Sequence, residues 1–550
     1  MSDSNIGARR NMNIRNHIFI VNSIINESIQ RKSPVDVIIS DYRQCFDVLW
    51  SHEITNDLFD NGVKNRNLSL IHEANKKHTV SVKTADGETK EDTVRDTLLQ
   101  GETFAPLSCS SHVDYIGKEC VEEEKYLYNY RDSVGVPPLT MIDDCIAVAK
   151  CGIETLELNE YLNTKTNMKK LQYSEDKCSR MHIGKKTGEC VPLRINAWKV
   201  RNVKNIETST YEVCDEIGEM AELKETDHTK YLGDVVSFNA SNKQNIQKRK
   251  EKGYMIIHQI KKILEDGFFG KFYFQAAILL RESLFLNSIL LNTEVWMNMK
   301  EKEMKELTIV DNSLLRTIWN CASYVSVPMM FLDLGILPLS FVVMKRRLMF
   351  LFYLLHQKEE SLLYRCFEAQ QEEKLPGDWI FQVEDDFRRL GMTITHQQIK
   401  MMSKTKYKEM IKSKIQMLAF KSLMREKSTQ SKCSSVKLDR LEIQRYLTCD
   451  TLTTRNKQML FQLRTASYPV FSNIKFMVSD TRCPCCCLEE DTLEHQLSCS
   501  VIHTGTKQIY NTSIQIEDVF SPCVEDQARI LLCFEQSINR RKIILKHMKQ

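Results

Sequence analysis

The architecture of this chain is inferred first from the segment Val136-Pro137-Pro138-Leu139-Thr140-Met141-Ile142-Asp143-Asp144-Cys145-Ile146-Ala147-Val148-Ala149. Two short apolar runs flank adjacent carboxylates, a pattern that predicts a tight β-hairpin with buried strands and a turn presenting Asp143 and Asp144. Because side chains alternate along a strand, only one of the two can point directly into a site. Adjacent carboxylates are costly unless a cation neutralises them, and oxygen ligands suit hard divalent ions, Mg²⁺ above all. A solvated turn is the simpler interpretation of the pair alone, so the metal hypothesis depends on the residues upstream.

The composition is ordinary for a soluble globular protein. The 550 residues are 42% hydrophobic and 27% charged, and the length suffices for several domains. A net charge of only +4 means that any nucleic-acid site must come from local basic patches. Nineteen cysteines and a polar N-terminus without a secretory signal predict a reduced, intracellular compartment.

Local charge and apolar runs refine this picture. Basic runs occur at 248–250, 345–347 and 540–542, and each fits a solvated helix face as well as a phosphate contact. The apolar runs at 276–291 and 331–355 are interrupted by charges before they reach the ~20 residues of a membrane span. We therefore expect core helices and no membrane association.

The N-terminal region places a second acidic residue beside a buried strand. Helical spacing of apolar residues predicts a helix over 14–29, and Val35 to Ser40 predicts a buried strand that ends at Asp41. An acidic residue at such a strand end is a common place for ion and phosphate chemistry, although Asp41 could simply cap the next helix. A hairpin is expected at 79–82 with a turn at 86–87, followed by a loop-to-helix joint at 98–107.

Five motifs in this order resemble the palm of reverse transcriptases, and their details are similar to those of LINE-type, non-LTR retrotransposons. They are Asp41 with Phe46, Gln100-Gly101 with Pro106, Asp143-Asp144, Lys177, and Tyr231-Leu232-Gly233. The spacing agrees as well, since Phe46 lies five residues after Asp41 and Pro106 six after Gln100. One departure is Met141-Ile142, where the family more often has an aromatic and a small residue.

The resemblance implies a role for each motif. Asp41 and Asp143, with Asp144 beside them, would hold two Mg²⁺ ions for nucleotidyl transfer onto a primer 3′-hydroxyl. Lys177 would lie near the triphosphate as a proton donor, although an ordinary exposed lysine is an equal alternative. The substrate contacts implied are a sugar-selecting ring at Phe46, a template-nucleotide contact at Gln100 and Gly101, and a primer grip at Tyr231, Leu232 and Gly233.

The resemblance also implies an α+β architecture in four parts. These are partial fingers and palm at 1–240, a helical thumb and connector at 241–375, a helical linker region at 376–480, and a zinc element with the C-terminal tail at 481–550. Apolar-rich stretches at 253–296, 311–319 and 331–355 agree with a helical middle, and 400–435 predicts a long helix followed by a linker.

A second motif predicts a metal site near the C-terminus. Cys483 and Cys486 form a knuckle, and His495 and Cys499 fall on one face of a helical turn, which is a spacing that suits one tetrahedral Zn²⁺. Cys485 and Cys487 leave the register open, and a redox-active or merely buried cysteine cluster is the alternative. The same element closes the C-terminal region of LINE-type reverse transcriptases.

The resemblance therefore predicts an RNA-directed DNA polymerase whose partners are an RNA template, a DNA primer and dNTPs, with nuclear residence expected. The alternatives are a catalytically inactive nucleic-acid-binding remnant, or a metal-dependent nuclease or phosphatase that leaves Phe46 and Gln100-Gly101 unexplained. About 40 residues precede Asp41, of which Arg9, Arg10 and Arg15 resemble the end of the fingers. We thus expect an N-terminally truncated form with weak activity or none.

Overall fold

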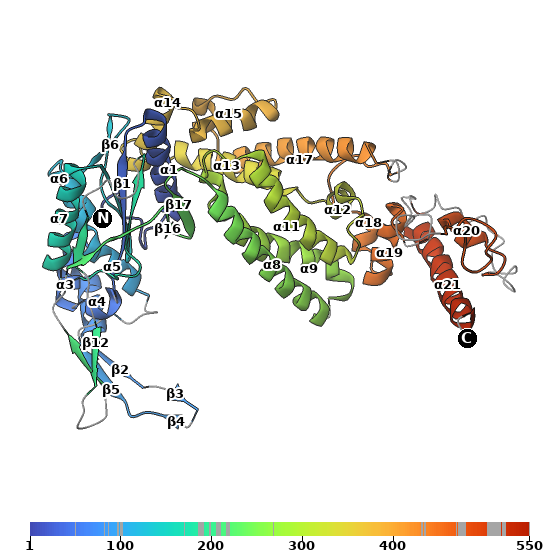
Figure 1. The fold of residues 1–550 in the computed structure, drawn as a ribbon, viewed down its shortest axis with the longest axis horizontal. Helices are drawn as coiled ribbons and strands as arrows, with labels where there is room; N and C mark the ends of the chain where they lie inside the picture. Colours follow the sequence, from blue (N-terminus) through green and yellow to red (C-terminus); the bar gives the residue numbers. More distant parts are fainter. Residues whose placement is uncertain are drawn as a thin grey trace.

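The computed structural model describes residues 1–550 except 44, 50, 82, 86, 96–97, 99–102, 170, 185–191, 197–199, 205–210, 216–219, 268, 431–432, 434–435, 469, 471–479, 503–518, 520–523 and 549–550. The molecule is elongated, with a mixed α and β part at one end and helices along the rest (Figure 1). We call residues 1–237 the sheet body and 243–464 the helical body.

A five-stranded sheet forms the centre of the sheet body, in the order β15-β10-β1-β9-β8. β1 pairs antiparallel with both β9 and β10, whereas β10 pairs parallel with β15. The predicted hairpin is confirmed as β8 and β9, joined by a two-residue turn at Ile142 and Asp143. The strand bounds are Leu139–Met141 (β8), Asp144–Lys150 (β9), Val35–Asp41 (β1), Ser179–Ile183 (β10) and Lys224–Glu225 (β15).

The central strand β1 faces two separate cores because its side chains alternate. Val35, Val37 and Ile39 point into one core and Ile38 into the other. On β9, Ala147 and Ala149 face the same side as Ile38, and their small side chains allow helix α7 (Ile153–Met168) to lie close to the sheet.

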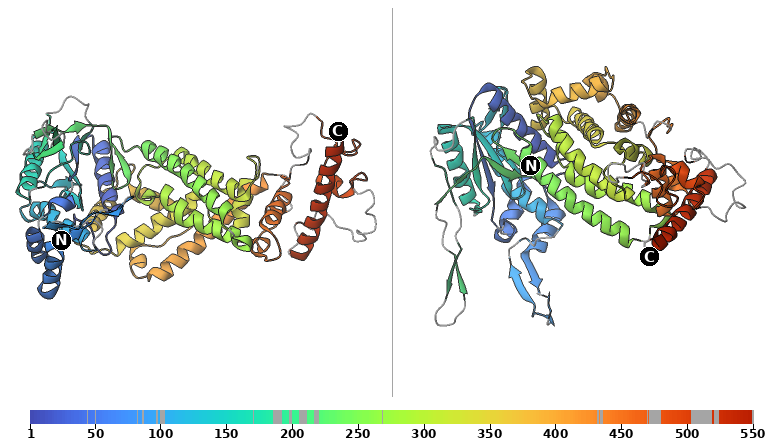
Figure 2. Two further views of the ribbon diagram at one scale, coloured as in Figure 1. Left: turned by 90° about the horizontal axis from the view of Figure 1, so that it is seen from below. Right: turned by 45° about the vertical axis from the view of Figure 1, so that its right-hand side comes forward.

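Helices cover both faces of this sheet (Figures 1 and 2). The predicted helix at 14–29 is confirmed as α1 (Ile14–Arg31), which begins at the cap residue Asn13 and buries most of its length. The helices that contribute to the second core are α2 (Cys45–Val48), α3 (Ser51–Asp60), α4 (Asn65–Lys76), α5 (Ala105–Val113), α6 (Tyr115–Glu122) and α7.

Two ribbons extend away from the sheet body (Figure 2). The first contains the hairpin expected at 79–82, although residues 82 and 86 lie outside the described part of the chain; the second is β12 with β13. The strands of the small two-stranded sheets are Lys77–Val80 (β2) with Asp92–Arg95 (β5), Lys83–Thr84 (β3) with Gly87–Glu88 (β4), Tyr128–Tyr130 (β6) with Val134–Val136 (β7), Arg194–Asn196 (β11) with Met220–Glu222 (β14), Val200–Lys204 (β12) with Tyr211–Asp215 (β13), and His228–Tyr231 (β16) with Asp234–Ser237 (β17).

The helical body contains the predicted helices, but the stretch at 253–296 is broken into several. Gly267 ends α8 in an extended conformation, and Asn292, with a φ of 60°, ends the run before η3. The bounds are Lys243–Asp266 (α8), Gly270–Phe272 (η1), Tyr273–Leu280 (α9), Arg281–Phe285 (η2, a π-helix), Leu286–Ile289 (α10), Thr293–Val295 (η3), Glu301–Trp319 (α11), Val327–Leu334 (α12) and Leu339–Leu355 (α13).

The remaining helices complete the chain toward the C-terminus. The long helix predicted within 400–435 is confirmed as α17. The bounds are Leu362–Glu372 (α14), Trp379–Arg389 (α15), His396–Lys400 (α16), Lys404–Ser428 (α17), Arg445–Thr448 (α18), Thr454–Arg464 (α19), Leu493–Ser498 (α20) and Val524–Met548 (α21).

A buried carboxylate joins the sheet body to the helical body. Asp234, the first residue of β17, is 3% exposed and accepts hydrogen bonds from Arg249 on α8 at 2.6 Å and from the Trp296 indole at 2.9 Å. A buried charge with both oxygens bonded fixes the geometry of the joint, because losing either partner would leave that charge uncompensated.

Within the described residues, no single helix is long and apolar enough to cross a membrane. The pair α12 and α13 has the length and composition only when taken together, across a bend of 53°.

Candidate active site and metal centre

Two of the predicted carboxylates lie directly opposite each other on adjacent strands. Asp41 is the last residue of β1, and its cross-strand partner is Asp144, the first residue of β9. Residues paired in this way present their side chains on the same face of the sheet. Asp143 occupies the adjoining turn, and its carbonyl oxygen accepts the Tyr42 N–H at 3.2 Å. The structure therefore brings the three acidic residues to one corner of the sheet.

The geometry of the hairpin turn explains why Asp143 lies in the turn and Asp144 in the strand. Ile142 adopts a left-handed φ of 58°, which closes the hairpin in two residues and leaves Asp143 outside the ladder. Asp144 is thus a strand residue, and it shares a face with the core residues Ile146 and Val148 of β9.

The corner is electrostatically strained because like charges meet there. Burial, with the charges of Asp143 and Asp41 adding to it, raises the pKa of Asp144 to about 6. Burial also raises the pKa of Asp143, and the Asp41 charge contributes. Like charges placed opposite each other destabilise a sheet, so this arrangement favours a bound cation.

Lys177 supplies one cation from a distant part of the sequence. Its ammonium lies 2.9 Å from Asp41 Oδ1, and this hydrogen bond raises the pKa of Lys177. The lysine follows a segment that runs along the end of β1, where the Ser174 N–H donates to the Asp41 carbonyl at 2.9 Å. The lysine side chain is 61% exposed, so it can move without disturbing the core.

The oxygen atoms of the three carboxylates are not close enough together to form a compact ligand set. Among the described residues, ligand atoms all within 4.8 Å of one another occur in two groups, Cys483 with Cys486, His495 and Cys499, and Asp36 with Cys151 and His182. Asp41, Asp143 and Asp144 form no such group. Like charges repel one another, and Asp41 is paired with Lys177 in this structure.

The predicted sugar-selecting residue Phe46 lies on the short helix α2. Its ring is half-buried against the second core, and its carbonyl oxygen accepts the Leu98 N–H at 3.1 Å. The neighbouring Cys45 has its Sγ 2.8 Å from that of Cys109, so α2 is held against α5. Gln100 and Gly101 lie outside the described residues.

The predicted primer grip forms the tight turn between β16 and β17. Leu232 and Gly233 both have positive φ, 45° and 84°. The Tyr231 side chain is 2% exposed, and its hydroxyl is 2.9 Å from His17 Nδ1 on α1. The tyrosine ring belongs to the core, so of the three predicted grip residues Leu232 and Gly233, in the turn, are the ones that can meet a ligand.

A buried charge network beside the sheet was not apparent from the sequence. Asp36, fully buried on β1, accepts hydrogen bonds from Arg180 at 2.7 Å, from Thr155 at 2.7 Å, and from His182. Although burial opposes its ionisation, these bonds hold the pKa of Asp36 well below its ordinary range. Because the Arg180 cation already neutralises this carboxylate, we assign the cluster a structural role and not a metal-binding one.

The three basic runs of the sequence also contribute to internal pairs. Arg249 bonds Asp234, Arg347 bonds Asp386 at 2.7 Å, and Arg541 bonds Asp491 at 3.0 Å. One arginine of each run is thus committed to the fold. These runs are weaker candidates for phosphate contact than their sequence suggests.

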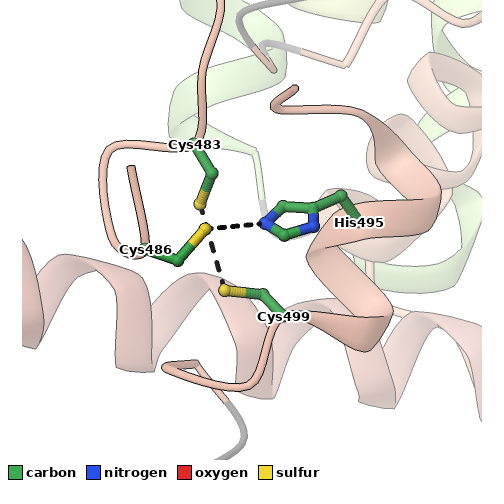
Figure 3. A group of neighbouring side chains, drawn as sticks. All are labelled: Cys483, Cys486, His495 and Cys499. Carbon is green, nitrogen blue, oxygen red and sulfur yellow. Dashed lines mark hydrogen bonds between the residues drawn. The ribbon is translucent and has the colours of Figure 1, made fainter. Parts of the chain in front are cut away.

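The four predicted zinc ligands converge near the C-terminus (Figure 3). The Sγ atoms of Cys483 and Cys499 are 4.0 Å apart, and Cys486 Sγ is 3.3 Å from His495 Nε2. Tetrahedral ligands with sulfur at ~2.3 Å from zinc lie ~3.8 Å from one another, so the donor set and spacing fit the ion. This Cys₃His cluster can hold a metal such as zinc.

The local backbone explains how these ligands are presented. A knuckle turn forms where the Cys487 N–H donates to the Cys483 carbonyl at 2.8 Å. Thr492 caps α20, which carries His495 one turn before Cys499. His495 Nδ1 lies 2.9 Å from Glu489, an outer partner that leaves Nε2 to face the thiols. Cys485 and Cys487 are outside the group, the latter being exposed.

Thiolate chemistry at the cluster also suits a metal. Although burial opposes ionisation of Cys486, backbone N–H groups of Glu489 and Leu488 together with His495 lower the pKa of this thiol to about 6. Burial raises the pKa of Cys483 to about 12. A divalent cation would offset the free-energy cost of ionising this buried thiol, because it binds the deprotonated form.

No protein-family model matches the sequence, and no curated protein matches it significantly. Among solved structures, the chain is similar to the telomerase of Candida tropicalis in complex with a TWJ fragment of telomeric RNA, at 11% identity and a TM-score of 0.28, covering 64% of this chain and 52% of that one. The Candida albicans telomerase in complex with the same kind of fragment gives 12% identity and a TM-score of 0.25, with the same coverage. The chain spans about half the length of these structures, and TM-scores this low do not establish a shared fold.

Proposed function

We propose that this chain is an RNA-directed DNA polymerase of the LINE type, which transfers nucleotides onto a primer 3′-hydroxyl. The observation that carries the proposal is the cross-strand pairing of Asp41 with Asp144, with Asp143 in the adjoining turn. Two Mg²⁺ ions at this corner would neutralise a nucleoside triphosphate and activate the hydroxyl that attacks it. An ordinary solvated hairpin turn does not explain why Asp41, about 100 residues earlier in the sequence, lies beside the Asp143-Asp144 pair.

The surrounding residues of the chain fit the same reaction. Lys177 presents an exposed ammonium at the carboxylate corner, where it can meet a triphosphate and donate a proton to the leaving pyrophosphate. Phe46 follows Asp41 on the adjoining helix, where an aromatic ring would leave no room for a ribose 2′-hydroxyl.

The test is primer extension by the full chain on an RNA template, with Mg²⁺ and dNTPs. Asp143→Asn should reduce incorporation by at least ~10², the scale of losing one preorganised charge-stabilising group. Asp176→Asn is the matched control, since Asp176 is exposed and lies in the turn next to Lys177. Equal activity in wild type and Asp143→Asn would rule out the proposal.

A second candidate, a nucleic-acid-binding protein without catalysis, is favoured by one observation. The three carboxylates do not converge to the 4.8 Å separation reached by the thiols and imidazole of the zinc cluster. Binding of an RNA–DNA hybrid without incorporation under any Mg²⁺ concentration would select this alternative.

The C-terminal cluster has a proposed role in either case. We infer that Cys483, Cys486, His495 and Cys499 hold one structural Zn²⁺, because four protein ligands leave no open position for a substrate. The metal would fold the segment around residues 481–502 and present it to nucleic acid.

A further inference from the structure

A cavity of about 620 Å³ lies between the N-terminal arm and the helical body. The arm contributes residues 9–12, α13 contributes its C-terminal half, and α17 contributes its first residue, Lys404. The cavity belongs neither to the carboxylate corner nor to the zinc cluster, and its lining includes Arg9, Arg10 and Arg15, which in sequence resemble the end of the fingers.

The lining of this cavity is strongly cationic. Five lysine or arginine side chains line it against the single acidic residue Asp3. Arg9 lies 3.6 Å from Asp3, and Arg15 bonds Glu294 at 2.7 Å. Within the described part of the chain, Arg10, Lys358 and Lys404 are exposed and make no ion pair. Three uncompensated cations from three separate segments therefore face one space.

Two further features suit an anionic ligand with flat rings. Lys404 opens the 25-residue helix α17, whose N-terminal dipole adds positive potential at the same place. The rings of Phe352 and His356, which also line the cavity, are stacked with centroids 3.9 Å apart. Cationic side chains interleaved with aromatic rings are the usual surface for a single nucleic-acid strand.

Hydrogen bonds join the N-terminal arm to α13 and to the strand that leads into the carboxylate corner. The Tyr353 hydroxyl donates to the Asn11 carbonyl at 2.8 Å, which fastens the arm to α13. Upstream, the Ile6 N–H donates at 3.1 Å to the carbonyl of Thr140 on β8, two residues before the hairpin turn. Gly7 lies against the hairpin turn itself, since a Cβ added at this glycine would be 3.0 Å from the Ile142 nitrogen. Arg10 follows Gly7 by three residues, so the Cα atoms of these two residues lie within ~11 Å of each other. The cavity is therefore close to the hairpin turn.

We propose that this cavity binds the phosphodiester backbone of a single strand of nucleic acid as it passes the carboxylate corner. Arg10, Lys358 and Lys404 contact phosphates of the strand, and the exposed His356 ring, which is stacked on the buried Phe352, meets a base. That the bound strand continues past the carboxylate corner rests on the proposed polymerase function, whereas binding of the strand in the cavity does not. A small polyphosphate would satisfy the charges but would not use the aromatic ring.

The experiment measures binding of the full chain to fluorescent single-stranded RNA and DNA oligonucleotides, without dNTPs or Mg²⁺, over a range of salt concentrations. The test variant is Arg10→Gln/Lys358→Gln/Lys404→Gln. The control is Lys302→Gln/Lys421→Gln/Lys437→Gln, which removes the same charge from exposed lysines outside this cavity. A parallel arm measures inorganic tripolyphosphate binding to all three proteins.

Each single-strand phosphate contact contributes ~0.7 to the slope of log affinity against log salt concentration. The test variant should therefore lose ~2 in slope magnitude for at least one of the two oligonucleotides, and comparing them shows whether the strand is RNA or DNA. The control should keep the wild-type slope. An unchanged slope in the test variant, an equal loss in the control, or a loss of tripolyphosphate binding alone would each overturn the proposal. Because no incorporation is measured, an inactive polymerase leaves the test valid.

Discussion

The Lys177 ammonium lies 2.9 Å from Asp41 Oδ1, although 135 residues separate the two in the sequence. A divalent cation that binds Asp41 has to share this carboxylate with the ammonium or displace it. Lys177 is therefore a competitor for metal before substrate arrives and a partner for phosphate afterwards. Its 61% exposed side chain allows both positions.

Replacing Lys177 by Gln should tighten Mg²⁺ binding and slow nucleotide incorporation. The affinity gain should be about fivefold, since an exposed ion pair contributes up to ~1 kcal/mol. Calorimetric titration of Mg²⁺ into the nucleotide-free chain measures it, with Lys224→Gln, an exposed lysine on β15, as control. Identical Mg²⁺ affinity in wild type and Lys177→Gln would remove Lys177 from the site.

Replacing Asp144 by Asn should stabilise the metal-free protein. The pKa of Asp144 is raised to about 6, so the folded state binds its proton more tightly than the unfolded state does. Stability is therefore lost as pH rises from about 4 to 6, and the cost persists above that range. Two pKa units correspond to at most ~3 kcal/mol, and solvent screening reduces the expected gain at pH 7.5 to roughly 1–2 kcal/mol.

Urea unfolding at pH 4 and pH 7.5 tests this expectation. The difference between Asp144→Asn and wild type should be large at the higher pH and small at the lower one. Saturating Mg²⁺ should stabilise wild type more than the variant. A variant less stable than wild type at pH 7.5 without metal would show that the carboxylate is not under repulsive strain.

The His182 network should give a second pH dependence at higher pH. The hydrogen bond to Asp36, followed by that to Glu225, raises the pKa of His182 above 6.5. The protonated imidazole contributes stability that is fully present below pH 6.5 and is lost as pH rises through the raised value. The decline in unfolding free energy above pH 6.5 should disappear in His182→Gln and persist in His228→Gln, where the histidine is exposed.

Zinc should fold the C-terminal cluster alone. Cys486→Ser should abolish the binding of one Zn²⁺ per chain, whereas Cys487→Ser, one residue further and exposed, should retain it. Chelation should increase hydrogen exchange around 481–502 and leave β1 and β9 protected, because metal binding and folding are coupled where the ligands lie. Full metal content in Cys486→Ser would mean that Cys485 or Cys487 completes the site instead.

Phe46→Ala should relax sugar selection if the ring excludes a 2′-hydroxyl. The measurement is the ratio of rNTP to dNTP incorporation, which should rise in the variant. Phe59→Ala on α3, where the ring is 53% exposed, serves as control. An unchanged ratio in an active Phe46→Ala enzyme would assign the ring a packing role only.

Local sequence patterns predicted the strands that carry the carboxylates. They could not predict the side-chain contacts around these strands, because the partners lie far apart in the sequence. Apolar residues before Asp41 and on both sides of Asp143-Asp144 predicted β1 and the hairpin, because buried strands leave a clear pattern. The pairing of Asp36 with Arg180 and His182 could not be foreseen, since charged partners more than 140 residues apart carry no local signal. Composition predicted helices within 253–296 but not the points at which they end, because a left-handed residue such as Asn292, which precedes η3, leaves the apolar composition unchanged.

The continuous core beneath β1 has a consequence for how the protein unfolds. Val35, Val37 and Ile39 share one set of buried contacts with α1, α8 and α13, and the same set extends to Phe461 on α19. A core that is assembled partly from helices later in the chain cannot keep its cooperativity without them. Calorimetry should therefore show the sheet body and the helical body melting in one transition. A fragment that ends after β17 would lose the part of this core that the helical body supplies, and the apolar side chains left exposed to water should make it aggregate.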